Sequence, residues 1–254
     1  MPRQQWQQTL DASVDVRNAG FTPVPHVSAR QLASARELDE LLEQLVRRAG
    51  VDHLLLVAGD RAQPVGPFAA SSDVLRTGLL DQHGIRHLSI AGHPEGHPHV
   101  SSDLLRAAEL EKVHLAEEAG LEVSFLTQFA FDGAPIVQWA GELRRRGVRS
   151  AVRIGLAGPA RLSTLLRYAV RCGVGPSIRA LGSRAANFGR LLGERGPEAL
   201  VRELARARGE GLEIDGIHLF SFGGLLRTCR WVRAVNEGRF ALNDAQGFVI
   251  DGTG

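Results

Sequence analysis

The sequence has few cysteines, no long apolar run and no apolar leader. Cys172 and Cys229 lie far apart and form no CxxC motif, which argues against a disulfide scaffold and against a thiolate zinc site. No stretch reaches the roughly 18 apolar residues that a membrane-spanning helix requires, and the amino-terminal residues lack the apolar segment of a signal peptide. These absences predict a cytoplasmic protein with no membrane partner.

The sequence also lacks a large excess of charge of either sign. Its 30 basic and 28 acidic side chains give a net charge of +2, and no block of Lys or Arg stands out. Nucleic acid is therefore not a predicted partner. Lys112 is the only lysine and Tyr168 the only tyrosine, in a sequence whose composition otherwise avoids both residue types.

Short apolar runs alternate with longer amphipathic stretches, which is the pattern of βα units. We predict six strands, at residues 21–27, 53–60, 87–93, 123–129, 150–156 and 216–222. Helices are predicted near residues 34–49, 70–83, 102–119, 134–146, 161–172, 184–193, 197–208 and 224–236. Nearly continuous apolar strands favour a parallel sheet that is covered on both faces, and the lack of a linker predicts one domain over residues 1–254.

The beginning of the chain does not fit this alternation. Residues 3–19 are expected to form a helix, and no strand precedes it. A closed (β/α)8 barrel needs eight strands, whereas only six are predicted here. Three alternatives follow: an open barrel, a doubly wound sheet, or a chain that begins inside the second unit of a barrel.

Polar or small residues stand at the end of every predicted strand, where parallel α/β folds bind their ligands. They are His26, Asp60, His93 with His97, Gln128 with Asp132, Gly155 and Ser221. One such residue is typical of ordinary loop polarity, but the whole set predicts a ligand site.

The segment AGHPEGHPH at residues 91–99 contains three histidines. Pro94 and Pro98 prevent the helix on which a His-x3-His pair would bind a metal, and neither cysteines nor clustered carboxylates complete a ligand set. We therefore predict no metal site here, and a turn that presents imidazoles to an anionic or aromatic ligand.

Four strings, in their order along the chain, resemble those of the methylenetetrahydrofolate reductase family, whose members are flavoproteins with a (β/α)8 barrel. The strings are HLLLVAGD (53–60), IAGHPEGHP (90–98), FLTQFAFD (125–132) and GIHLF (216–220). The second and third are the most specific, since the family has A-x-Y-P-E-x-H-P and I-T-Q-F-F-F-D there. The resemblance covers nearly the whole chain. It implies a TIM-barrel type α/β fold in which six βα units are present and the first strand, first helix and second strand are missing.

The resemblance implies an oxidoreductase that interconverts 5,10-methylenetetrahydrofolate and 5-methyltetrahydrofolate, with FAD as cofactor and NAD(P)H as co-substrate. Asp60 takes the position of the aspartate that tunes the flavin potential and hydrogen-bonds the folate. Gln128 matches a pterin-binding glutamine, and Tyr168 matches an aromatic residue that stacks on folate or nicotinamide. The other positions at which the family contacts FAD are His26, His93, His97, Asp103 and Lys112.

The sequence departs from the family at several positions. The family's proton-donating glutamate lies on the first strand, which has no counterpart here, so Asp60 and Glu95 are the first candidates for the proton donor. Ala58 replaces an arginine and Phe220 a tyrosine. Two alternative functions stay open: a folate- or flavin-binding barrel without reductase turnover, and an enzyme that works mainly toward oxidation of 5-methyltetrahydrofolate. The oligomeric state is also open, with a homo-oligomer among the alternatives.

Overall fold

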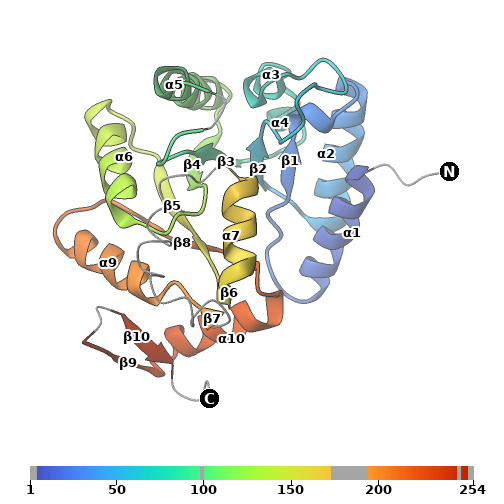
Figure 1. Cartoon of the computed structure of the whole chain (residues 1–254). Helices are drawn as coiled ribbons and strands as arrows, with labels where there is room; N and C mark the ends of the chain where they lie inside the picture. Colours follow the sequence, from blue (N-terminus) through green and yellow to red (C-terminus); the bar gives the residue numbers. More distant parts are fainter. Residues whose placement is uncertain (1–4, 98–99, 173–193, 245–246, 251–254) are drawn as a thin grey trace. The chain divides into compact units, whose positions relative to one another are not determined.

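A computed structural model shows an α/β protein with a parallel sheet of six strands (Figure 1). It describes residues 5–97, 100–172, 194–244 and 247–250. The chain divides into two compact units, which are described separately below. Unit 1 comprises Met1–Gly92 and Asp103–Leu126, and unit 2 comprises His93–Ser102 and Thr127–Gly254. That residues 1–254 form one ligand-binding domain stays a prediction.

All six predicted strands are confirmed as elements of the parallel sheet, because each overlaps one apolar run of the sequence. They are β1 (His26–Ser28), β2 (His53–Val57), β3 (His87–Gly92), β4 (Glu122–Thr127), β5 (Ala151–Ala157) and β8 (Gly216–Phe220). Two short antiparallel pairs were not predicted. They join β6 (Ala160–Arg161) to β7 (Glu194–Arg195) and β9 (Phe240–Leu242) to β10 (Phe248–Ile250).

The predicted helices are found with one difference and one exception. The described helices are α1 (Gln5–Asn18), the 3-10 turn η1 (Ala29–Gln31), α2 (Ala35–Ala49), α3 (Ser71–Leu75), α4 (Leu79–Gln82), α5 (Ser102–Glu118), α6 (Gly133–Arg145), α7 (Leu162–Arg171), α9 (Glu198–Gly209) and α10 (Leu225–Asn236). The single helix predicted at 70–83 is two short helices, because Gly78 adopts a φ of +71° between them. The helix predicted at 184–193 lies outside the described residues.

Unit 1 is built on the strand order β1-β2-β3-β4. Helix α2 buries Leu38, Leu41, Leu42 and Leu45, whose spacing places them on one face of the helix. The predicted helix at the start of the chain is confirmed as α1, which packs against α2. The Arg17 guanidinium of α1 donates hydrogen bonds of 2.8 Å each to the carbonyls of Ala49 and Gly50, so it satisfies acceptors at the carboxyl end of α2.

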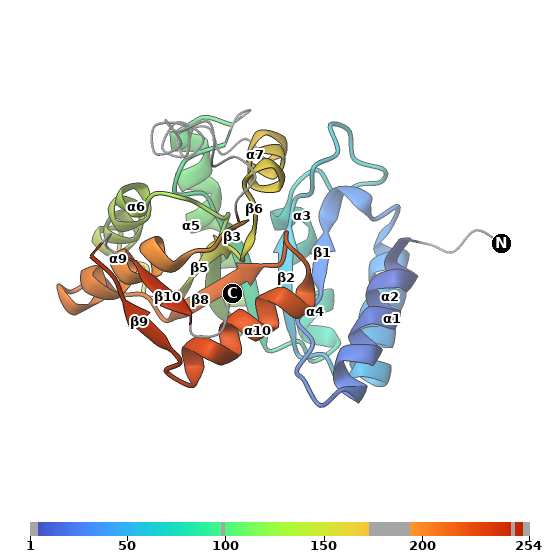
Figure 2. The ribbon, with the colours of Figure 1, turned by 60° about the horizontal axis from the view of Figure 1, so that its bottom comes forward.

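Unit 2 contains the parallel pair β5–β8, whose register runs from Arg153 opposite Gly216 to Ala157 opposite Phe220. Strand β10 packs against α9 and α10 (Figure 2). Trp231 of α10 lies in a small core with residues of β10, and its indole N–H donates a 2.7 Å hydrogen bond to Glu198.

The strands of unit 1 follow one another in chain order, without the reversal that marks a doubly wound sheet. Sequential parallel strands are consistent with a TIM-barrel-like fold. Closure of the strands into a barrel is not detected among the described residues. In the same part of the chain, every helix is too short or too polar to cross a bilayer.

Candidate functional site

Asp60 lies in the loop that follows β2, in unit 1, and is exposed. The side chain of Arg30 holds this loop, because its Nη1 donates to the Arg61 carbonyl at 2.9 Å and its Nε to the Ala69 carbonyl at 2.7 Å. At Gly59, where φ is +93°, an added Cβ would lie 3.2 Å from the Cβ of Ser28. The loop therefore passes close to the end of β1 and presents Asp60 to solvent.

His26 was predicted at the carboxyl end of its strand, and this placement is wrong. It is the first residue of β1, because Pro23 and Pro25 have no N–H to donate and the regular ladder begins only after them. His26 lies largely at the surface, yet the protein around its ring desolvates the imidazole and lowers its pKa. The ring is therefore held toward its neutral form.

His93 and His97 belong to unit 2, and His93 follows the end of β3 as predicted. Their rings meet edge to face, with centroids 5.6 Å apart and planes at 83°. His93 is half-buried and His97 is exposed. Among the described residues, no group of three or more His, Cys, Asp or Glu side chains is placed to hold a metal ion.

Helix α5 of unit 1 carries Asp103 in its first turn, where it is exposed, and Lys112 farther along, where it is half-buried. Desolvation lowers the pKa of Lys112, and the nearby carboxylates of Glu109 and Glu111 act in the opposite direction. Among the described residues, the Lys112 amine has no hydrogen-bond or ion-pair partner.

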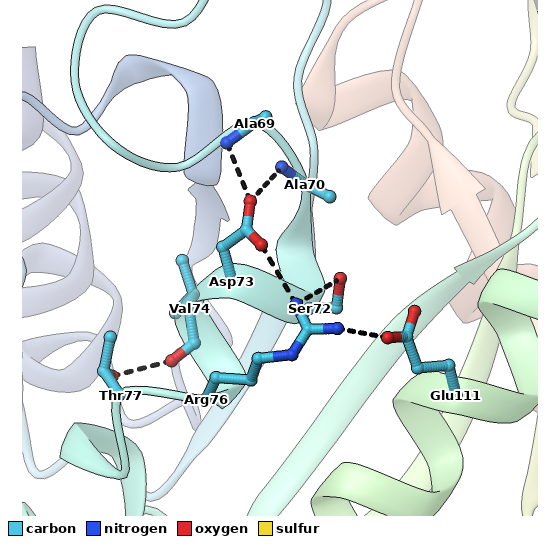
Figure 3. Close-up of polar contacts among 8 residues, drawn as sticks. All are labelled: Ala69, Ala70, Ser72, Asp73, Val74, Arg76, Thr77 and Glu111. Carbon is cyan, nitrogen blue, oxygen red and sulfur yellow. Dashed lines mark hydrogen bonds and ion pairs between the residues drawn. The ribbon is translucent and has the colours of Figure 1, made fainter.

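The acids beside Lys112 are bound to arginines. Glu109 is almost fully buried and pairs with Arg106 at 2.7 Å on the same helix. Glu111 pairs with Arg76, at the end of α3, as Figure 3 shows. Arg76 also lies 3.0 Å from Asp73, whose carboxylate accepts the N–H groups of Ala69 and Ala70 (Figure 3). This network ties α3 to α5 within unit 1.

A cluster of five aromatic side chains lies in unit 2, and we call it the aromatic cluster. Its members are Phe129, Phe131, Tyr168, Phe220 and Phe222. Tyr168 stacks on Phe222 with centroids 4.2 Å apart and planes at 16°. Phe222 is in turn nearly parallel to Phe220, at 5.7 Å and 11°. Phe129 meets Phe131, Phe220 and Phe222 edge to face.

Gln128 follows the last residue of β4, as predicted, and immediately precedes Phe129. Its Oε1 accepts the N–H of Phe129 at 3.1 Å. Tyr168 packs against the core that contains Phe129, and Gln128 is the sequence neighbour of Phe129 in unit 2. Sequence reasoning missed Phe129 and Phe222 as members of this site. The signal was the pair of aromatics that follows β4, Phe129 and Phe131, and the pair at and just beyond the end of β8, Phe220 and Phe222.

Two further positions have structural roles in unit 2. Gly155, which was predicted near the carboxyl end of its strand, lies two residues before the end of β5, and its N–H donates to the Thr127 hydroxyl at 2.8 Å. Asp132 is the N-cap of α6 and accepts the N–H of Ala134 at 3.1 Å. These hydrogen bonds are sufficient to explain why Gly155 and Asp132 stand at their positions, without a role in ligand binding.

Two glycines, Gly223 and Gly224, directly precede α10. A Cβ on Gly223 would meet the carbonyl oxygen of Pro159 at 1.9 Å. The close approach of two backbone segments is therefore sufficient reason for glycine at this position.

A groove of about 470 Å³ lies in unit 1 between α1 and α2. It is lined by Trp6, Gln7, Leu10, Asp11, Glu40, Glu43, Gln44 and Arg48. The site residues predicted from the sequence do not line it. Unit 1 holds His26, Asp60, Asp103 and Lys112, and unit 2 holds His93, His97, Gln128 and Tyr168.

A search with protein-family models finds no family model that matches this chain.

Proposed function

We propose that this protein is a flavin-dependent oxidoreductase that interconverts 5,10-methylenetetrahydrofolate and 5-methyltetrahydrofolate. The proposal starts from the resemblance of the strings that end successive strands. One structural observation carries it further: the nearly parallel rings of Phe220, Phe222 and Tyr168 in unit 2.

A stack of aromatic rings suits a flat heterocycle such as a pterin or a nicotinamide. Phe222 is the middle member of the stack, and Tyr168 is an end member that is only half-buried. A ligand ring placed on Tyr168 would extend the stack. Gln128 adds an amide, which can donate and accept hydrogen bonds at the edge of such a ring.

The residues proposed to hold FAD have suitable chemistry. Lys112 offers an amine that has no ion-pair partner among the described residues and can serve a phosphate. The imidazoles of His26, His93 and His97 can donate or accept hydrogen bonds, and Asp103 can accept them from hydroxyl groups. When bound, FAD supplies the hydride chemistry, which no side chain can provide.

The roles left to the chain are positioning and proton transfer. Tyr168 would hold the pterin plane, and Gln128 would fix its rotation in that plane. Opening the methylene bridge of the substrate needs a proton at the folate nitrogen N10. Asp60, which is exposed beyond β2, and Glu95, which is half-buried, are the first groups to test as its source.

The proposal is tested by adding FAD to the purified protein and recording the visible spectrum under anaerobic conditions. We expect a protein-bound flavin spectrum that NADH or NADPH bleaches and that methylenetetrahydrofolate restores. Flavin binding without bleaching would favour a binding protein that lacks reductase turnover. If the protein bound neither flavin nor tetrahydrofolate, the proposal would fail.

Replacing Tyr168 with alanine is expected to weaken tetrahydrofolate binding about fivefold, because a stacked aromatic pair contributes on the order of 1 kcal/mol. Tyr168→Phe keeps the ring and is the matched control, so it should bind as the parent does. Isothermal titration of both variants measures the two dissociation constants, and circular dichroism checks the fold. Equal affinities of the alanine and phenylalanine variants for tetrahydrofolate would show that Tyr168 serves only in packing.

A further inference from the structure

Lys112 is chemically distinct within this chain. It is the only lysine among 254 residues, in a sequence whose other basic side chains are arginines and histidines. It lies on α5 in unit 1 and is half-buried, so its amine is neither fully hydrated nor closed off from small molecules.

The carboxylates that would normally keep such an amine protonated are engaged elsewhere. Glu109, three residues before Lys112, is buried and pairs with Arg106 at 2.7 Å. Glu111 pairs with Arg76, which reaches it from the end of α3 (Figure 3). Each carboxylate therefore has a guanidinium partner, and among the described residues none forms an ion pair with Lys112.

Burial affects the pKa of Lys112 more than the neighbouring carboxylates do. Desolvation lowers the pKa of Lys112, and the attraction of Glu109 and Glu111 offsets only part of that effect. A lysine that loses its proton more readily has a larger fraction of free amine near neutral pH, and the free amine is the nucleophilic form.

We propose that Lys112, in the ligand-free protein, is a nucleophilic amine that condenses with small aldehydes, and that this makes it a covalent modification site. The Nζ lone pair attacks the carbonyl carbon, and the carbonyl oxygen takes up a proton to give a carbinolamine. Loss of one water molecule and one proton then leaves a neutral imine between Nζ and the former carbonyl carbon. The step consumes no oxidant or reductant, and the proposal does not depend on the oxidoreductase activity proposed above.

The test uses formaldehyde as the probe, with cyanoborohydride added only to trap the imine as a methylated amine. Arg36 is 86% exposed on α2, so Arg36→Lys places a solvated reference lysine in the same molecule. Peptide mapping by mass spectrometry then gives the methylation rate at each lysine near pH 7. We expect Lys112 to react several times faster than the reference. An equal or lower rate at Lys112 would overturn the proposal.

Two variants at the Glu111–Arg76 ion pair test whether the charges around Lys112 set its reactivity. Glu111→Gln removes a carboxylate that favours the charged amine, so methylation at Lys112 should speed up. Arg76→Gln instead leaves the Glu111 carboxylate without its arginine and free to stabilise the ammonium, so methylation should slow. A general loosening of the fold would speed both. Changes of the same sign in the two variants would therefore contradict the electrostatic basis of the proposal.

Discussion

Replacing Gly155 with alanine is expected to lower the free energy of unfolding by about 3 kcal/mol, because the new methyl group meets atoms that cannot easily move. An added Cβ would lie 2.2 Å from the carbonyl oxygen of Thr127 and 2.7 Å from the ring of Phe220. The first contact is with backbone, and the second is with a member of the aromatic cluster. Urea unfolding followed by circular dichroism measures the loss.

Gly141 provides the control in the same unit. It lies within α6, where an added Cβ would approach only the flexible end of Arg145, at 3.4 Å. Gly141→Ala is expected to raise the free energy of unfolding by up to about 1 kcal/mol, because alanine favours the helix. If both alanine variants were as stable as the parent, the inference that β5 packs too closely against the Thr127 carbonyl to accept a side chain at Gly155 would be wrong.

The Gly155 variant also tests the site. Its N–H donates to the Thr127 hydroxyl, and Thr127 immediately precedes Gln128. A backbone shift at Gly155 would therefore displace both the proposed pterin ligand Gln128 and the ring of Phe220. We expect ligand binding to weaken in this variant at temperatures where it is still folded.

Most of the strands could be predicted from the sequence because their apolar residues are buried in the sheet, although β8 is half-buried or exposed along its length. Leu54, Leu56 and Ile90, for example, are fully buried. The strand ends were harder to place, since they depend on single hydrogen bonds rather than on burial. β1 begins at His26 because two prolines precede it, and β5 extends to Ala157, one residue past the predicted end, because β8 pairs with it as far as Phe220.

Only part of the candidate site could be predicted from the sequence. Gln128 was located by its position after β4, whereas the stack of Tyr168 on Phe222 joins a helix to a loop more than 50 residues away. No periodic pattern encodes such a contact. Likewise, the spacing of Arg106 and Glu109 allows an ion pair, but it does not reveal that the pair is buried.

Because that ion pair is buried, we expect removal of its carboxylate to lower the stability of the protein strongly. The Arg106 and Glu109 side chains are only 11% and 2% exposed, and each makes further interactions. Glu109→Gln would remove the carboxylate that pairs with the buried Arg106 guanidinium at 2.7 Å. We expect a loss of about 3 kcal/mol in the free energy of unfolding, measured by urea titration at neutral pH.

The control is the exposed pair on α2, where Arg36 and Glu40 are 3.7 Å apart and 86% and 47% exposed. Glu40→Gln is expected to cost no more than about 0.5 kcal/mol, because water already solvates both charges. The two glutamates lie on helices of unit 1 and undergo the same chemical change. The difference between the two variants therefore reports the desolvation of the pair rather than the loss of a carboxylate.

A double variant separates the cost of removing one charged partner from the value of the pair itself. Arg106→Leu combined with Glu109→Leu removes both buried charges, and buried pairs replaced by apolar residues are often close to neutral in stability. We expect the double variant to be more stable than Glu109→Gln alone, although it lacks one more charged side chain. If it were the less stable of the two, the pair would hold α5 in place by its own attraction, and the desolvation argument would be wrong.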